Sequence, residues 1–339
     1  MTAPCGGPAG KAAAIVDYDS GFDYLAFWDN RDYEYWLEAR LLRRLLPRLG
    51  GGQWFADFGG GYGRHAPEYQ RAADHTILVD YSATQLTKAS ERLAGEIGAG
   101  RIHLIRADLA HLPLVDGAVD TAMVVRVLHH LTNLDPALRE MGRVVNRRWL
   151  VDVPIKHHAL ARWRGLRRGS WAELRGPEPM VTGSTEYPFH TFSLAAVRRT
   201  LTRSGFHTRT AASVNNFRRW DQMFGPTLVR ALRPVVYPAE LLAQRLGRSW
   251  WGPSQFLFAT RGSGPIFRSQ APQRGTPASL AQLAQRTCCP RCRGPLAWGG
   301  DSSDCTACGI RFSRQARFWD FTKPLALRDA EPPVPAAPG

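Results

Sequence analysis

The sequence predicts an α/β protein with a doubly wound, mostly parallel sheet and a small metal-binding module near its C-terminal end. Three observations predict this architecture. Strand-like and helical segments alternate between residues 53 and 154, a glycine-rich turn follows the first strand, and two Cys-x-x-C pairs stand close together near residue 300. Parallel strands joined by helices require right-handed crossovers, which place helices on both faces of the sheet.

Length and composition agree with one large domain and one small one. The chain has 339 residues, and domains most often have about 100–200 residues. Hydrophobic residues make up 44% of the chain, so a large core can form. No apolar run approaches the ~20 residues of a membrane span, and the N-terminus is a poor secretory signal. We therefore expect a cytoplasmic protein with no transmembrane segment.

The region before the alternating pattern has two parts. Residues 1–17 are small and rich in Gly, Pro and Ala, and we expect them to be disordered. The segment up to residue 49 is rich in aromatic residues and then in leucines at helical spacings, with arginines on the other face. We expect this segment to be helical and to pack beside the sheet, at the start of a domain over residues 18–261.

The alternating pattern gives the order of elements in that domain. We expect strands at residues 54–59, 75–82, 101–109, 119–131 and 147–154, and helices at 63–73, 83–97 and 134–145. Residues 156–190 are rich in arginine, interrupt the pattern and predict an insertion. A helix at 193–204, ended by Gly205, and a last strand at 254–262 complete the domain.

The C-terminal part divides into a linker, a module and a tail. Residues 262–285 are rich in Gly, Pro, Gln and Ser, which suits a linker. Residues 286–322 hold the clustered cysteines and predict the small module. Residues 323–339 end in PPVPAAPG, and we expect a flexible tail.

A glycine-rich turn follows the first predicted strand and opens the first helix. It reads Asp57-Phe-Gly59-Gly-Gly61-Tyr-Gly63. Glycine lets the backbone turn sharply and pass close beneath a ligand, where a Cβ atom would obstruct it. The turn alone is a weak signal because dinucleotide-binding folds share it. Its spacing nevertheless departs from the G-x-G-x-x-G of dinucleotide oxidoreductases.

Two acidic residues end the second and third predicted strands. Asp80 follows the glycines by about twenty residues, where a carboxylate can accept hydrogen bonds from ribose hydroxyls. Asp108 stands where a side chain would face an adenine. Both lie at carboxyl ends of strands, where α/β sheets bind ligands. The alternative for either acid alone is a cap of a turn or helix.

The glycine turn and the segments LVDYS, RADLAHLPLVDGAVD and VVRVLHHL together resemble class I S-adenosylmethionine-dependent methyltransferases of the type 11-like group. The resemblance covers residues 57–153 and implies a Rossmann-like methyltransferase fold with S-adenosylmethionine as the cofactor. It implies that the glycine loop contacts the methionine and ribose, one acid the ribose and the other the adenine. The implied cofactor-binding residues are Asp57, Gly59, Gly61, Gly63, Asp80, Tyr81, Asp108, Leu109 and Arg126.

Two histidines follow the fourth predicted strand, where family members line the methyl-donor pocket. His129 or His130 is a candidate general base because imidazole titrates near neutrality. The alternative is that one histidine packs and the other caps the next turn. The chain lacks the Asn/Asp-Pro-Pro-aromatic motif of many amino-group methyltransferases, which argues against that chemistry.

The most specific signal is a pair of Cys-x-x-C knuckles, Cys289 with Cys292 and Cys305 with Cys308. Two knuckles supply four thiolates for a closed tetrahedral zinc site, which holds a module together and does no chemistry. Cys288 is the spare cysteine. A pair of exchanging disulfides is the redox alternative.

The segments CPRCRGPL, CTACGIRF and FWDF resemble the small zinc-ribbon activator subunit of RNA- and protein-modifying methyltransferases, and zinc ribbons fused to some ribosomal RNA methyltransferases. The resemblance implies a ribbon that packs on the catalytic domain or presents arginines to nucleic acid. A simple folding support is the alternative.

Three functions remain open. The net charge of +15 and the basic insertion favour an anionic partner, and hence an RNA methyltransferase. The histidines and an apolar stretch at residues 220–246 favour a small-molecule or lipid-linked acceptor. The third hypothesis is an inactive binding protein that keeps the fold.

Overall fold

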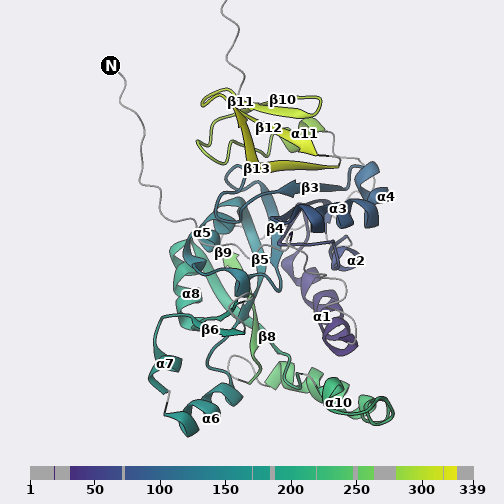
Figure 1. Ribbon diagram of the computed structural model, residues 1–339, viewed down its shortest axis with the longest axis vertical. Coiled ribbons are helices and arrows are strands. Elements are labelled where there is room, and N and C mark those ends of the chain that lie inside the picture. The colour runs from purple at the N-terminus through teal and green to yellow at the C-terminus, as the bar shows by residue number, and fades with distance from the viewer. Residues whose placement is uncertain are drawn as a thin grey trace, which may run out of the picture.

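The computed structural model describes residues 19, 31–70, 73–169, 171–183, 188–218, 220–246, 251–262, 280–315 and 317–326. Within these ranges, eleven strands form one sheet in the order β10-β11-β12-β13-β3-β2-β1-β4-β5-β9-β8 (Figure 1). The predicted disordered start, most of the predicted linker and most of the predicted tail lie outside the described residues.

The centre of the sheet is parallel, as predicted. Its strands are β1 Gly52–Phe58, β2 Ala73–Asp80, β3 Ile102–Arg106, β4 Val119–Val124 and β5 Val145–Pro154. On one side, β9 (Ser254–Arg261) pairs antiparallel with β5, and β8 (Phe206–Val214) pairs antiparallel with β9. The strand β8 therefore runs in the same direction as β5.

Helices cover both faces of this sheet, which confirms the doubly wound fold. Consecutive side chains of a strand point to opposite faces. Trp54 of β1 accordingly packs with α5 (Leu134–Val144) and α8 (Leu194–Arg203), whereas Phe55 packs with helices on the other face. Those other helices are α1 Asp32–Leu45 with the short helix Leu46–Leu49, α2 Ala66–Tyr69, α3 Ala83–Arg92, α4 Ala94–Gly98, α9 Trp220–Met223 and α10 Pro226–Leu246.

Several elements differ from the sequence-based expectation. The segment predicted as one strand over 119–131 stops at Val124, because Arg126 adopts a left-handed backbone with φ of 62°. A short 3₁₀ helix, Leu128–His130, follows. The helix expected at 63–73 shrinks to α2, and the one at 83–97 breaks at Leu93 into α3 and α4.

The predicted insertion holds four elements of its own. These are α6 Ala159–Arg168, α7 Trp171–Arg175, β6 Met180–Gly183 and β7 Pro188–Thr191, the last two forming a separate antiparallel pair. In Figure 1, α6, α7 and α10 project from the end of the molecule opposite the C-terminal strands. Across the residues that the structure describes, none of the helices has the length and apolar character that crossing a membrane demands.

The C-terminal cysteine module continues the main sheet. It contains α11 Leu280–Ala284, β10 Leu296–Gly299, β11 Ser302–Cys305, β12 Ile310–Gln315 and β13 Phe318–Ala326. The last of these strands pairs in parallel with β3, with Phe318 opposite Leu104 and Asp320 opposite Arg106. Trp319 of this module belongs to the same hydrophobic cluster as Trp54. The complete sheet is therefore mixed, with a parallel centre and antiparallel ends.

Candidate functional site

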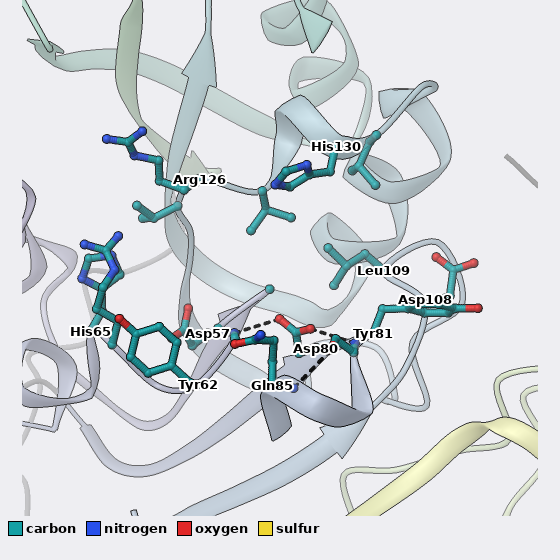
Figure 2. Close-up of a pocket in the computed structure, with 18 residues that line it drawn as sticks. Asp57, Tyr62, His65, Asp80, Tyr81, Gln85, Asp108, Leu109, Arg126 and His130 are labelled. Carbon is teal, nitrogen blue, oxygen red and sulfur yellow. Dashed lines mark hydrogen bonds between the residues drawn. The ribbon is translucent and has the colours of Figure 1, made fainter. Parts of the chain in front are cut away.

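One pocket opens at the carboxyl edge of the parallel strands. It holds about 950 Å³ of empty space, counted together with the open solvent at its mouth. Figure 2 shows the side chains around it. They come from the ends of β1 to β4 and the turns that follow: Asp57, Gly59, Gly60, Gly61, Tyr62, Arg64, His65, Asp80, Tyr81, Ser82, Gln85, Asp108, Leu109, Val125, Arg126, Val127, His130 and Leu131.

The glycine turn and Asp80 are joined by a hydrogen bond. The backbone N–H of Gly61 donates to Oδ2 of Asp80 at 2.8 Å, and that of Ser82 donates to Oδ1 at 2.9 Å. Gly61 has φ of 53°, and a Cβ atom placed there would meet nothing within 4 Å. The turn thus leaves open space over its backbone, with a carboxylate beside it.

Gly63 does not line the pocket, although the sequence grouped it with the other glycines. Its φ is 76°, and an added Cβ atom would lie 2.6 Å from Cδ1 of Leu93. Glycine is needed there because the turn packs against the end of α3. Gly63 therefore contributes to the shape of the turn.

Asp57 is almost fully buried beneath the turn. Burial, reinforced by the nearby Asp80 carboxylate, raises the pKa of the Asp57 carboxyl to about 8. One of its oxygens, Oδ2, has no hydrogen-bond partner among the described residues. Burial also raises the pKa of Asp80, while the N–H groups of Ser82 and Gly61 oppose that shift.

Asp108 lines the pocket while its carboxylate is held locally. Oδ1 accepts from the N–H of Ala110 at 2.9 Å, and Oδ2 lies 2.9 Å from Nδ1 of His111. Leu109 is buried behind it, and Tyr81 is partly exposed at the rim. Asp108 thus caps a turn, as its alternative interpretation expects, and also lines the pocket.

Arg126 lies across the pocket from Asp80, as Figure 2 shows, and its guanidinium is held by acids of α1. Nη2 lies 2.7 Å from Oε2 of Glu34, and Nε donates to Glu38. The Arg126 backbone N–H donates to Asp152 Oδ2 at 3.1 Å. These carboxylates, chiefly Glu38, raise the pKa of Arg126 despite its burial, so it remains a cation in the wall of the pocket.

The two candidate histidines occupy different places. His130 lines the pocket, whereas the ring of His129 stacks on Phe189 of β7 with centroids 4.4 Å apart. Burial, with His190 nearby, lowers the pKa of His130 to about 3, and burial holds the pKa of His129 well below its usual value. Both rings are therefore neutral near pH 7.

Sequence reasoning missed Gln85, a pocket residue whose side-chain amide lacks hydrogen-bond partners among the described residues. It sits in the first turn of α3, is only 3% exposed, and neither Nε2 nor Oε1 has a hydrogen-bond partner in the described part of the chain. Leaving a buried amide unpaired costs free energy, so such a group points to a ligand. A buried polar position facing the strand ends was the available signal, but the helical pattern alone does not show which side chain turns inward.

The four predicted zinc ligands converge. One sulfur from each of Cys289, Cys292, Cys305 and Cys308 lies within 4.8 Å of all the others. The Cys289–Cys308 and Cys292–Cys305 sulfurs are 3.7 and 3.4 Å apart. A tetrahedron with Zn–S bonds of about 2.3 Å has sulfurs ~3.8 Å apart, so the set fits zinc. Cys288 does not join this set; it is buried, and its N–H donates to the Pro113 carbonyl.

An ion-pair chain links the cysteine module to the pocket's edge. Arg106 ends β3, and its guanidinium contacts Asp320 of β13 at 3.2 Å and Asp19 at 3.1 Å. Asp19 in turn accepts a hydrogen bond from the Ser82 hydroxyl at 2.6 Å, beside Asp80. Asp19 belongs to no motif, and Asp320 entered the sequence analysis only as part of the segment FWDF, without a partner.

The segment that forms this pocket is similar to known proteins. Residues 56–148 match the family model described as a methyltransferase domain, which confirms the expected similarity to methyltransferases. The O-methyltransferase rstn1 of Aspergillus nomiae is 28% identical over 137 residues, covering 39% of this chain and 61% of that protein. The ubiquinone/menaquinone biosynthesis C-methyltransferase UbiE of Vibrio cholerae is 31% identical over 97 residues, covering 28% of this chain and 37% of that protein.

Two further similarities concern another curated relative and a solved structure. The methyltransferase GfsG of Streptomyces halstedii is 28% identical over 178 residues, covering 44% of this chain and 64% of that protein. The chain thus spans less than two thirds of the length of these relatives. Among solved structures, the YcgJ protein of Bacillus subtilis shares 13% identity over 66% of this chain and 99% of that one, with a TM-score of 0.44.

Proposed function

We propose that this protein is an S-adenosylmethionine-dependent methyltransferase that acts on a small-molecule acceptor. The observation that carries the proposal is the pocket itself. The open backbone of Gly61, the Asp80 carboxylate and the unpaired Gln85 amide meet there, inside a segment that matches a methyltransferase domain.

The predicted site residues, together with Gln85, have distinct roles in this proposal. Asp80 and Gln85 offer hydrogen-bond groups to the cofactor, and Tyr81 and Leu109 flank the strand ends. Gly59, Gly61 and Gly63 shape the turn, Asp57 supports it from below, Asp108 lies at the adenine end and Arg126 forms part of the wall. The cofactor's sulfonium supplies an electrophilic methyl group, so the protein's main task is to position the acceptor and exclude water.

His130 is the better candidate of the two histidines for contact with the acceptor, because it alone lines the pocket. Its ring is neutral near pH 7 and can accept a hydrogen bond from an acceptor hydroxyl. With a pKa of about 3 it is a weak base, so it suits an acceptor that gives up its proton readily. His129 would instead hold the ring of His130 in place, at a centroid distance of 3.8 Å.

The names of the relatives favour a small acceptor. One is an O-methyltransferase and another acts in ubiquinone and menaquinone biosynthesis, as a C-methyltransferase. RNA remains the second candidate because of the net charge of +15. Phosphate contacts weaken steeply with ionic strength, so retention on RNA that disappears in salt would support it.

The cysteine module is proposed to be a zinc ribbon that supports the methyltransferase sheet from within the same chain. The convergence of the four sulfurs supports a structural zinc ion. The resemblance to a separate activator subunit remains a proposal, and the pairing of β13 with β3 and the Arg106–Asp320 contact are compatible with it. We expect the metal to have no open position for chemistry.

Isothermal calorimetry with the demethylated cofactor, followed by isotopic labelling of extracts, tests the proposal. The wild-type chain should bind the cofactor, and Asp80→Asn should bind it roughly tenfold or more weakly because a charged hydrogen-bond acceptor is lost. Asp116→Asn, a change of the same kind at an exposed ion pair, is the control. Label in the metabolite fraction supports the small acceptor, label in RNA supports the alternative, and absence of cofactor binding overturns the enzyme assignment.

A further inference from the structure

The outer face of α10 carries a row of exposed apolar side chains. Leu228, Val235 and Leu242 recur every seventh residue, and Leu246 follows one turn later; their exposed fractions run from 47% to 69%. This spacing places them on one side of the helix. Scattered exposed leucines are ordinary, whereas an aligned row on one helix indicates a surface that is covered in use.

The inner face of α10 packs against the rest of the protein. The exposed apolar row therefore lies on the face of α10 that points away from those contacts. Glu240 is fully buried and accepts hydrogen bonds from the Tyr33 hydroxyl at 2.7 Å and from Asn216 Nδ2 at 2.9 Å. The ring of Tyr237 lies 4.1 Å from that of Trp36 in α1. The apolar row therefore has a fixed support.

A second exposed apolar face lies on α6. Leu160, Trp163 and Leu166 are spaced by three residues and are 47%, 54% and 73% exposed. The guanidinium of Arg167 lies over the Trp163 ring, 4.9 Å from its centroid. This combination of an indole, aliphatic side chains and arginines is typical of helices that lie in a lipid interface.

The charges on these two helices have one sign. Helix α6 contains four arginines, Arg162, Arg164, Arg167 and Arg168, and no acid. Helix α10 contains Arg230, Arg233 and Arg245, and its single acid is the buried Glu240. The exposed surface of both helices is thus apolar with a purely basic surround, which complements an anionic surface.

Both helices leave the sheet at the edge where the pocket opens. Helix α6 begins at Ala159, five residues after β5 ends at Pro154. Helices α9 and α10 follow β8, which runs parallel to β5 and so ends at the same edge. Figure 1 shows α6 and α10 projecting at the end of the molecule away from the cysteine module, α6 at the lower left and α10 at the lower right.

We propose that the exposed faces of α6 and α10 dock the protein on an anionic lipid bilayer, with the carboxyl edge of the sheet turned toward the lipid. The apolar side chains enter the interface and the arginines meet the lipid phosphates. Taken with the proposed function, on which this further step rests, docking places the methyl-transfer pocket where an apolar acceptor dissolved in the bilayer can reach it.

Two other partners, a second copy of the chain and RNA, fit the exposed faces of α6 and α10 less well. A second copy joined by a twofold axis would bring the arginines of these helices against their own counterparts, and like charges in contact repel. RNA would use the arginines but leaves the apolar row exposed to water. An anionic bilayer satisfies both kinds of side chain.

Vesicle flotation of the full chain tests the proposal. Neutral phosphatidylcholine vesicles are compared with vesicles in which about one third of the lipid is phosphatidylglycerol, at low and high salt. The apolar test variant is Val235→Gln with Leu242→Gln, and its control is Leu280→Gln with Leu325→Gln, two exposed leucines of the C-terminal module. The charge variant is Arg167→Gln with Arg168→Gln, and its control is Arg48→Gln with Arg291→Gln, both exposed on other surfaces.

The wild-type chain should float with the anionic vesicles and much less with the neutral ones. The apolar variant should bind roughly tenfold more weakly, and the charge variant roughly twentyfold, or about fivefold for each arginine. Both controls should bind like the wild type, and all variants should bind the demethylated cofactor equally in calorimetry. Loss of cofactor binding in the wild type would count against the proposed function and leave the docking result unaffected.

Any one of four results would overturn the docking proposal. The wild type fails to bind anionic vesicles at low salt, or the test and control variants lose binding equally. Light scattering shows a dimer that the apolar variant dissociates, in which case a second copy covers the face. Retention on RNA is lost with Arg167 and Arg168 while vesicle binding stays unchanged, in which case the arginines serve RNA.

Discussion

Asp57 and Asp80 lie at the carboxyl ends of the neighbouring strands β1 and β2, beside one glycine turn, yet their environments differ. Asp80 accepts two backbone N–H groups at the pocket, whereas Asp57 is buried with one oxygen unpaired. The same residue type therefore offers a hydrogen-bonded carboxylate to the pocket at one position and is expected to reduce stability at the other. Sequence spacing identifies both acids, but only the packing around them separates their parts.

Replacement of Asp57 should stabilise the free protein in a pH-dependent way. With a pKa of about 8, folded Asp57 holds its proton at pH values where the unfolded chain has lost it. The stability from this proton is complete below pH ~4 and is lost as the pH rises through about 8. Asp57→Asn should therefore raise the free energy of unfolding by roughly 1–3 kcal/mol at about pH 7.5 and by little at about pH 4.5.

Denaturant unfolding at the two pH values measures this difference. Asp116→Asn removes an exposed carboxylate and should show no such pH window. An equal gain at both pH values for Asp57→Asn would mean that the carboxyl is not protonated in the folded chain.

Gln85 gives a second prediction at this scale, with two effects of opposite sign. Gln85→Leu removes a buried amide that has no partner among the described residues, so the free protein should gain about 1 kcal/mol of stability. Cofactor affinity should fall about three- to tenfold, because the hydrogen bonds that the amide would make to the ligand are lost. Denaturant unfolding and calorimetry measure the two effects. A variant that is less stable and binds normally would show that Gln85 serves the fold alone.

At the scale of elements, the parallel centre of the sheet could be predicted because hydrophobic residues there recur at the spacings typical of strands and helices. It missed β8, since Phe206–Val214 mixes polar and apolar residues without alternation at an edge of the sheet. It also ran β4 too far, because Val125 and Val127 look like strand residues while Arg126 adopts φ of 62°. That conformation is held by Asp152 and by the acids of α1, contacts that no local pattern reveals.

Metal removal should detach the cysteine module from β3. Loss of zinc leaves four thiols with no centre to hold the two knuckles, and metal binding contributes folding free energy directly in such modules. A strong chelator, or Cys292→Ser, should accelerate amide exchange in β13 and along β3 by roughly a hundredfold or more. Elemental analysis should find one zinc ion per chain in the wild type.

Cys288→Ala is the matched control, because Cys288 neighbours the knuckle without joining the four converging sulfurs. It should keep its zinc and its slow exchange. Loss of zinc from Cys288→Ala, or unchanged exchange after Cys292→Ser, would refute the assignment of ligands.

At the scale of the whole molecule, the cysteine module covers the edge of the parallel strands, because β13 pairs with β3. Without β13, the strand β3 would present unpaired N–H and C=O groups, which are sites of pairing between molecules. A chain that ends at residue 279 should therefore self-associate at concentrations where the full chain stays monodisperse. Size-exclusion chromatography with light scattering distinguishes the two, and a monodisperse shortened chain would contradict the prediction.

The continuity of the sheet could not be predicted from the sequence. The Cys-x-x-C spacing identifies a module, and the glycines and acids identify a pocket, but pairing between β13 and β3 depends on contacts far apart in the chain. The resemblance of the ribbon allowed packing on the catalytic domain as one alternative. The packing itself is seen in the buried Trp319 and in the Arg106–Asp320 ion pair.

Arg106 and Asp320 are 214 positions apart, and this separation affects how the protein is made. A ribosome adding about 5–20 residues per second needs roughly 10–40 s to synthesise that interval. During this time β3 has no partner strand at its outer edge. A chaperone would be the means of shielding the unpaired N–H and C=O groups there. On the proposed zinc site, maturation of the protein would then wait on the delivery of one metal ion to the last part of the sheet to be synthesised.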